Sequence, residues 1–286
     1  MPEGDTVWQT ARRLAVLSGQ QLTATDFRLP SLATVDLGGR TVLETVSRGK
    51  HLLTRIEGGA TLHSHLKMEG RWDVQAAGAR WRRPAHEARV VLHTASHDAI
   101  GFSVVLDLVA TDDEETLVGH LGPDLLGPDW DPEEAVRRIA AAPDVPVGQA
   151  PLDQRSLAGA ARRSDTAGRT IGEALLDQRC LAGIGNVIKS EVLFLAGVWP
   201  FTPVPDVPDL RKVVDLAHRV LVANRDRPVR VTTGNTRRGQ ELWVYGRARQ
   251  PCRRCRTPIK MDRQGEPPED RVTYWCPSCQ PEPRRA

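Results

Sequence analysis

The chain has 286 residues, a net charge of +3 and a mean hydropathy of −0.37, which is the composition of a globular protein with room for two or three small domains. It contains no run of eighteen apolar residues, which excludes a transmembrane helix. Glu3 and Asp5 stand where a secretory signal would carry basic residues, and no apolar stretch follows them. We therefore expect a cytoplasmic protein that does not associate with membranes.

The positive charge is concentrated at the C-terminal end. Positions 237 to 286 hold 12 Lys and Arg against 6 Asp and Glu, a local charge of +6, which leaves −3 for the rest. A basic end on a nearly neutral body suits contact with a polyanion such as nucleic acid. On charge alone, a solvated basic tail is an equally good interpretation.

The first part of the chain predicts one helix followed by strands. Residues 6–18 place Val7, Ala11, Leu14 and Leu17 on one helical face. Short apolar runs without helices between them then favour a β-sandwich or barrel. The predicted strands are 21–27, 40–47, 51–56, 60–66, 89–94 and 102–108.

Beyond residue 124 the pattern becomes helical. Helices are predicted at 132–142, 170–178, 186–196 and 209–224, and the last fifty residues have no helical period. The predicted fold is therefore a multidomain α+β chain. Its parts are an N-terminal β-sandwich with a leading helix (1–124), a helical domain (125–235) and a cysteine-bearing domain (236–286).

One octamer occurs twice. Residues 152–159 read LDQRSLAG and residues 176–183 read LDQRCLAG, 24 positions apart. Two copies are too few for a repeat fold, so we interpret them as a local duplication. The small and polar residues of 148–168 predict a surface insert that contains the first copy.

Four of the five cysteines form two pairs near the C-terminus. Cys252 and Cys255, then Cys276 and Cys279, are Cys-x-x-Cys pairs with twenty residues between them. Such pairs can offer four thiolates to one tetrahedral Zn²⁺, and the span between them suits a β-hairpin, that is, a zinc ribbon. We expect one structural zinc, because four thiolates leave no open position for water. Cys180, the fifth cysteine, is interpreted as a core residue.

Two further short segments are chemically suggestive. The glycines of 181–186 precede Asn186 and allow a turn that could hold a phosphate at a helix N-terminus, although an ordinary helix–helix connection explains them equally well. If Met1 is removed, Pro2 presents a secondary amine able to attack a sugar C1′, and Glu3 could exchange protons beside it. The alternative is an unremarkable frayed chain start.

Six motifs occur in a fixed order along the chain. They are PEGD at the start, SRGK (47–50), SHLKMEG (64–70), LGPDLL (121–126), LDQRCLAGIGN (176–186) and the four cysteines. In this combination and order, they resemble the formamidopyrimidine-DNA glycosylase/endonuclease VIII family, over nearly the whole chain apart from the insert. The PEGDT start and the TTGNTRRG segment at 232–239 resemble the actinobacterial endonuclease VIII-like branch.

The resemblance implies a role for individual residues. Pro2 is the expected Schiff-base nucleophile and Glu3 the expected acid/base. Lys50 and Arg271 are expected to contact phosphate and assist elimination. DNA-binding roles are implied for His65, Lys67, Met68, His120 and Asn186, with Met68 as the wedge that fills the space of a flipped nucleotide. For His65, the alternative interpretation is a histidine that is buried in a strand and does not contact DNA.

The sequence departs from the family pattern at three positions. Thr6 replaces a glutamate that many members carry, so any role of that carboxylate is absent. Lys67 and His120 occupy positions often held by Gln and Arg in endonuclease VIII.

The implied function is a bifunctional DNA glycosylase/AP lyase of base excision repair. It would act as a monomer on damaged double-stranded DNA and associate with the nucleoid when bound. Oxidised pyrimidines are the expected substrates, and the central domain is expected to be a helix-two-turn-helix. Two alternatives are a non-catalytic DNA-binding relative that senses lesions and a zinc ribbon joined to an unrelated enzyme.

Overall fold

A computed structural model describes residues 2–141, 168–265 and 270–283. The predicted insert at 148–168, apart from its last residue, and the first octamer copy lie outside the described residues. Contacts divide the chain into two compact units, Met1–Gly119 and His120–Ala286. Within the described ranges, no helix is long and apolar enough to cross a membrane.

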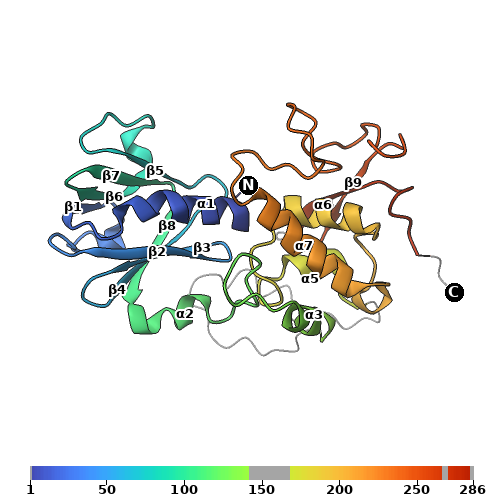
Figure 1. Ribbon diagram of the computed structural model, residues 1–286, viewed down its shortest axis with the longest axis horizontal. Helices are drawn as coiled ribbons and strands as arrows, with labels where there is room; N and C mark the ends of the chain where they lie inside the picture. Colours follow the sequence, from blue (N-terminus) through green and yellow to red (C-terminus); the bar gives the residue numbers. More distant parts are fainter. Residues whose placement is uncertain (1, 142–167, 266–269, 284–286) are drawn as a thin grey trace. The chain divides into compact units, whose positions relative to one another are not determined.

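The first unit is a β-sandwich with a leading helix, as predicted. Two four-stranded antiparallel sheets, in the orders β1-β6-β7-β5 and β2-β3-β4-β8, face each other, and helix α1 runs alongside them (Figure 1). Short 3₁₀ turns connect several of these elements. The bounds are α1 Gly4–Leu14, β1 Leu22–Phe27, β2 Val42–Arg48, β3 His51–Ile56, β4 Ala60–His65, β5 Arg71–Ala76, β6 Ala88–Thr94, β7 His97–Phe102, β8 Val105–Ala110 and α2 Glu115–Val118.

Alternation of apolar and polar residues along the strands builds the core between the sheets. Leu52 and Leu62 are essentially inaccessible to solvent and pack with Val7 and Leu14 of α1. The indole Nε1 of Trp72 on β5 donates to Ser64 Oγ on β4 at 3.1 Å, which satisfies a polar group that would otherwise be buried without a partner. The residues that alternate with these along β3 and β4, among them His51, Arg55, His63 and His65, point to the opposite, outer face of their sheet.

The prediction of one strand over 102–108 is wrong. In the structure β7 ends at Phe102 and β8 begins at Val105, and the two strands belong to different sheets. Ser103 between them has a φ of 51°, a left-handed conformation that turns the chain out of the first sheet. Strand β5 was also missed, because its only two inward-facing apolar side chains of any size, Trp72 and Val74, alternate with the charged or polar residues Arg71, Asp73 and Gln75.

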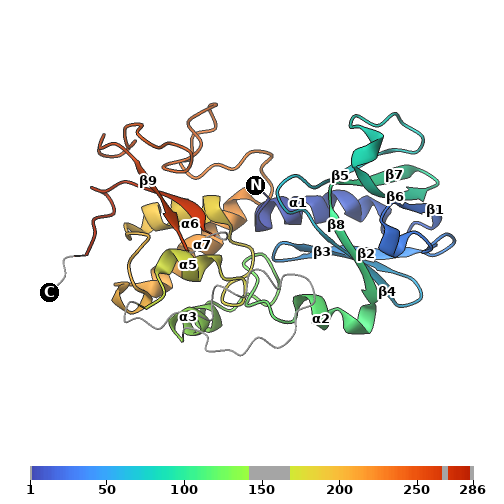
Figure 2. The ribbon, with the colours of Figure 1, turned by 180° about the vertical axis from the view of Figure 1, so that it is seen from behind.

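The second unit is helical and ends in a two-stranded hairpin (Figure 2). Asp131 and Asp209 cap α3 and α7 by accepting a backbone N–H, and Thr170 with Glu173 forms a capping box at α5. Gly197, at a φ of 75°, ends α6. The elements are α3 Pro132–Ala140, α5 Ile171–Leu176, α6 Asn186–Ala196, α7 Leu210–Asn224, β9 Lys260–Gln264 and β10 Arg271–Trp275.

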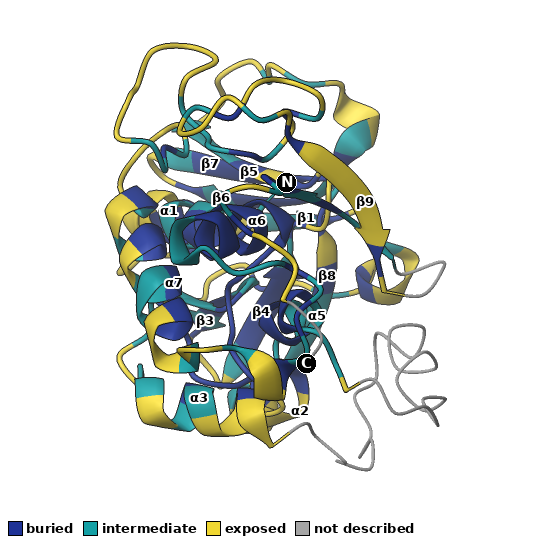
Figure 3. Cartoon of the chain, turned by 90° about the vertical axis from the view of Figure 1, so that its right-hand side faces the viewer, coloured by how far each residue is buried: buried dark blue, intermediate teal, exposed yellow. Residues whose placement is uncertain are grey.

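Helix α6 is the central element of this unit. Residues 186 to 194 are all buried, and Figure 3 shows the helix in the colour of buried residues. A helix that is apolar nearly all round is typical of a core element. Four buried polar residues on it, Asn186, Lys189, Ser190 and Glu191, therefore require partners. Ser190 donates to the Asn186 carbonyl at 3.0 Å within the helix, whereas the partners of the other three organise the candidate site.

Candidate nucleic-acid interface and metal centre

Pro2 and Glu3 lie at the N-terminus of α1. Glu3 is the N-cap residue in an extended conformation, and its carbonyl accepts the Val7 N–H at 3.0 Å. The Glu3 side chain is fully buried, whereas Pro2 is half-buried. The positive end of the helix dipole lies at this terminus, which favours a negative group and disfavours a second positive one.

Lys50 lies in the tight turn between β2 and β3. Gly49 before it has a φ of 58°, a conformation that glycine adopts without strain. This turn explains why glycine precedes the lysine in SRGK: the chain must reverse direction within the two residues Gly49 and Lys50 that connect β2 to β3. Lys50 is half-buried, and its charge acts on His65 of the neighbouring strand β4. The structure thus brings Lys50 and His65 together.

Residues 66 to 70 form a tight loop after β4. The Gly70 N–H donates to the Leu66 carbonyl at 2.8 Å, and a Cβ on Gly70 would lie 2.4 Å from that same oxygen. Glycine is therefore required at the end of the SHLKMEG segment. The loop presents Lys67, at a φ of 48°, and Met68, a residue that is 63% exposed. An insertion wedge would need an exposed apolar side chain of this kind, so the wedge role of Met68 stays a prediction.

His65 is held in one tautomer by this loop. Its Nδ1 accepts the Lys67 backbone N–H at 2.9 Å, so Nε2 must carry the proton of the neutral ring. Burial, followed by the charges of Lys67 and Lys50, lowers the pKa of His65 to about 3. Its Nε2–H is then a neutral donor that suits a phosphate oxygen.

We expect the His65 ring to stay neutral down to pH 5. Because its folded pKa lies below the ordinary value near 6.5, His65 favours the folded state most above that value, and this contribution declines as the pH falls towards about 3. Nitrogen NMR of the imidazoles between pH 5 and 8 measures this directly. Protonation of His65 with a midpoint near 6.5 would contradict the geometry.

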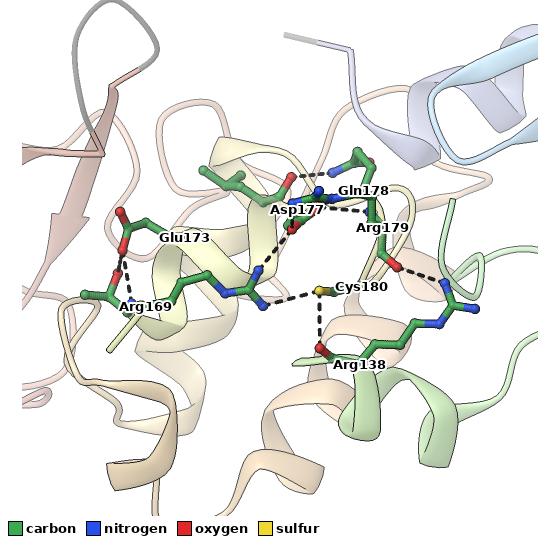
Figure 4. A network of polar contacts seen from close by, with 9 residues as sticks. Arg138, Arg169, Glu173, Asp177, Gln178, Arg179 and Cys180 are labelled. Carbon is green, nitrogen blue, oxygen red and sulfur yellow. Dashed lines mark hydrogen bonds and ion pairs between the residues drawn. The ribbon is translucent and has the colours of Figure 1, made fainter. Parts of the chain in front are cut away.

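The LDQRCLAGIGN segment folds into a turn between α5 and α6, stabilised by its own side chains (Figure 4). Gln178 Nε2 donates to the carbonyls of Leu176 and Ile184 at 2.8 and 3.0 Å, and its Oε1 accepts the Gly183 N–H. Gly183 has a φ of 106°. Gln178 thus fixes the backbone that leads to Asn186.

Asp177 anchors the other side of the same turn. Its carboxylate accepts hydrogen bonds from Arg179 and from Arg169, whose other nitrogen lies 3.2 Å from Cys180 Sγ (Figure 4). Burial acts to raise the pKa of Asp177, but the hydrogen bonds and charges of the two arginines outweigh it and lower the pKa. Burial raises the pKa of the Cys180 thiol, which agrees with its interpretation as a core residue.

Asn186 and Lys189 join α6 to the C-terminal hairpin. Asn186 Nδ2 donates to the Val272 carbonyl at 2.5 Å, beside Arg271. The fully buried Lys189 ammonium donates to Thr273 Oγ1 at 2.6 Å and to Gln264 Oε1 at 3.3 Å. The Asn186 side chain therefore positions the strand that carries Arg271, a role that the sequence did not reveal.

Glu191 was missed altogether by the sequence analysis. Its buried carboxylate accepts the backbone N–H groups of Trp243, Val244 and Tyr245 at 2.7 to 2.9 Å, and the Thr232 hydroxyl. These contacts hold both ends of the segment that contains TTGNTRRG. The available signal was a glutamate in a mostly apolar helix.

Glu191→Gln is expected to lower the free energy of unfolding by about 3 kcal/mol. The variant puts an amide donor against a backbone donor and removes charge-assisted hydrogen bonds, each of which contributes about 1.5–3 kcal/mol. Urea unfolding of the two proteins measures the difference. Glu133→Gln is the matched control, because that side chain is 70% exposed and should change stability by less than about 0.5 kcal/mol. Equal losses in both variants would refute the anchoring role.

The four paired cysteines come together and could hold a metal ion. Their Sγ atoms all lie within 4.8 Å of one another. The Cys252–Cys279 and Cys255–Cys276 separations are 3.9 and 3.4 Å, close to the roughly 3.8 Å between thiolates around a tetrahedral ion with 2.3 Å bonds. The hairpin β9–β10 connects the two pairs, as predicted for a zinc ribbon.

Arg271 and His120 are the remaining predicted residues. Arg271 is exposed at the start of β10, opposite Gln264, and its guanidinium donates to the Asp270 carbonyl at 3.2 Å. His120 begins the second unit, and burial followed by the Arg179 charge lowers its pKa. Arg271 thus belongs to the part of this unit that Asn186 and Lys189 position, whereas His120 lies beside the Asp177–Arg179 turn.

Comparison with known proteins agrees with these features. Residues 1–105 match the formamidopyrimidine-DNA glycosylase N-terminal domain, and residues 147–224 match the formamidopyrimidine-DNA glycosylase H2TH domain. The chain is 54% identical to the probable endonuclease 8 2 of Streptomyces coelicolor, over 99% of this chain and 96% of that protein. It is 47% identical to the DNA-(apurinic or apyrimidinic site) lyase Nei2 of Mycolicibacterium smegmatis, over 98% and 99%.

A solved structure has the same fold. The Fpg (MutM) of Lactococcus lactis, crystallised with DNA that contains N7-benzyl-Fapy-dG, superposes with a TM-score of 0.75 at 23% identity, over 98% of this chain and 100% of that one. This likeness confirms the predicted architecture. Together with the two matched domains and the identity to the curated relatives, it establishes that the chain belongs to the formamidopyrimidine-DNA glycosylase/endonuclease VIII family, in its actinobacterial endonuclease 8 2 branch.

Proposed function

We propose that the protein is a bifunctional DNA glycosylase/AP lyase of base excision repair that uses Pro2 as its nucleophile. The observation that carries this proposal is the start of α1 in a chain of this family, where Pro2 adjoins a fully buried Glu3. The relatives named endonuclease 8 2 and AP lyase, and the Fpg complexes with damaged and abasic DNA, support it.

The proposed reaction follows from the chemistry of a secondary amine. Removal of Met1 frees the Pro2 nitrogen, which attacks C1′, and the glycosidic bond breaks as the base leaves with a proton. Sugar ring opening gives an iminium ion, with Glu3 exchanging protons. The iminium acidifies the C2′ hydrogen, whose loss expels the 3′ phosphate, and a second elimination expels the 5′ phosphate.

The remaining predicted residues would hold the DNA in a distorted form. The damaged nucleotide must leave the stack, at a cost of a few kcal/mol. Phosphate contacts from Lys50, His65 and Arg271 would offset this cost, and Met68 would fill the gap. We assign Asn186 a backbone contact beside the lesion, and Lys67 and His120 supporting contacts.

The ion at the cysteines is proposed to be one structural Zn²⁺. Four thiolates at these separations match tetrahedral zinc and leave no open position. Zinc would keep Arg271 in place through the hairpin. The proposed domains are catalytic (1–124), helix-two-turn-helix (125–235) and zinc ribbon (236–286), in a cytoplasmic monomer that associates with the nucleoid through DNA.

The proposal is tested with a panel of duplexes that contain an oxidised pyrimidine, an oxidised purine, uracil or an abasic site. We expect release of oxidised pyrimidines and cleavage of abasic sites on both sides of the sugar. Tight binding to abasic DNA without any cleavage would instead identify the non-catalytic DNA-binding relative.

A further inference from the structure

Three polar side chains form a chain of hydrogen bonds across the outer face of the sheet β2-β3-β4-β8. His63 Nδ1 lies 3.1 Å from Asp107 Oδ2, and His63 Nε2 lies 2.8 Å from His51 Nδ1. The register places His63 directly opposite Asp107 and places His51 opposite His65, so all four side chains project from one face. His63 and Asp107 are largely covered, with 6% and 23% of their side chains exposed.

The direction of these hydrogen bonds follows from the carboxylate. An ionised carboxylate can only accept, so His63 donates from Nδ1 and, as a neutral ring, accepts at Nε2. His51 must then donate from Nδ1, so its Nε2 carries no proton while the ring is neutral. His51 is the outer end of this chain of three side chains. A carboxylate and a second imidazole thus support one histidine in a defined tautomer, as in catalytic and metal-site histidines.

The outer end of this chain lies among the residues that we assign to DNA phosphates. His51 follows Lys50 directly, and its ring meets the His65 ring edge-on with centroids 5.1 Å apart. The charged or titratable groups around it on the neighbouring strands and turns include Arg48, Lys50, His63, His65, Lys67 and Asp107.

We propose that His51 is a further ligand of the DNA backbone, and that His63 and Asp107 position it and stabilise its protonated form. This inference rests on the proposed function. A proton on Nε2 gives an imidazolium that donates to His63 through Nδ1 and to a phosphate oxygen through Nε2. The surrounding cations oppose this proton in the absence of DNA, whereas a phosphate and the Asp107 carboxylate favour it.

DNA binding would therefore be accompanied by proton uptake at His51. His65 does not provide this proton, because its Nδ1 is already an acceptor for the Lys67 N–H and its pKa is lowered to about 3. By linkage, the affinity for DNA rises as the pH falls through the range in which imidazoles titrate.

The test measures the dissociation constant for a duplex that contains a non-cleavable tetrahydrofuran abasic analogue, at half-unit steps from pH 5.5 to 7.5. In the parent protein, we expect the affinity to rise by up to about tenfold per pH unit of acidification, the limit for uptake of one proton. His51→Gln should remove most of this dependence. Asp107→Asn keeps the shape of the chain but removes its charge, so it should move the pH dependence of the dissociation constant to lower pH.

His93→Gln is the matched control. His93 Nδ1 also pairs with a carboxylate, Asp98 at 2.7 Å, but on the other sheet, so this variant should keep the full pH dependence. An unchanged pH dependence in His51→Gln overturns the assignment of His51, and an unchanged one in Asp107→Asn overturns the supporting role of the chain. If the parent protein does not bind this duplex at any pH, the proposed function fails instead.

Discussion

A protein that keeps a residue in front of Pro2 is expected to cleave abasic DNA at least about 10³-fold more slowly than the processed protein. The extra residue converts the secondary amine into an amide, which cannot attack C1′ or form an iminium ion. Single-turnover cleavage of an abasic duplex measures the loss. Pro2→Gly should lose less, because it still offers a primary amine.

The affinity for DNA shows whether the loss of cleavage comes from the blocked amine or from a damaged fold. The blocked protein should bind the tetrahydrofuran duplex with nearly the affinity of the processed protein, because the phosphate contacts do not involve the amine. Lys50→Ala is the complementary variant. Its binding to DNA should weaken, and the slope of log affinity against log salt concentration should fall by the amount expected for about one phosphate contact. Full cleavage by the blocked protein would contradict the assignment of Pro2.

Cys276→Ser is expected to release the metal ion and to weaken binding to damaged DNA by about tenfold or more. Structural zinc contributes about 10–16 kcal/mol to the folding of small ribbons, so the hairpin that carries Arg271 should lose its order without the ion. Metal analysis of the parent protein should give close to one zinc per chain. The affinity for the tetrahydrofuran duplex at two salt concentrations measures the lost phosphate contact.

Cys180→Ser is the matched control for the metal. Cys180 is buried near Arg169, outside the cysteine cluster, so this variant should keep its zinc and its DNA affinity. A parent protein that contains no metal and still binds damaged DNA tightly would refute the structural role of zinc.

Much of the architecture could be predicted because the apolar periodicity of a segment and the turn residues at its ends indicated the same element. Helix α6 begins at Asn186 and ends before Gly197, as expected from the glycines that border it. Strand β3 over His51–Ile56 was also predicted with its observed bounds. The β7–β8 connection was not predictable from apolar runs, because Ser103 adopts a left-handed conformation inside an apolar stretch and moves the chain to the second sheet.

The polar contacts of the site depend on pairings that are distant in sequence. Glu191 contacts backbone groups more than fifty positions away, and His63 meets Asp107 only because β4 and β8 pair in one register. A pattern of residue types does not show which residues of two paired strands lie opposite each other, nor which distant group a buried side chain contacts. The sequence motifs therefore pointed to candidate site residues such as Pro2 and Lys50. The residues that position segments around the site, such as Glu191 and His63, could be found only from the structure.

Borohydride reduction in the presence of abasic DNA tests the central claim most directly. Reduction of the iminium ion links protein and DNA irreversibly, and mass spectrometry of the digested adduct locates the linkage. We predict one adduct per chain, with the sugar remnant on the nitrogen of an N-terminal peptide that begins at Pro2. A remnant on a lysine side chain such as Lys50, or no adduct from a protein that cleaves abasic DNA, would contradict the account.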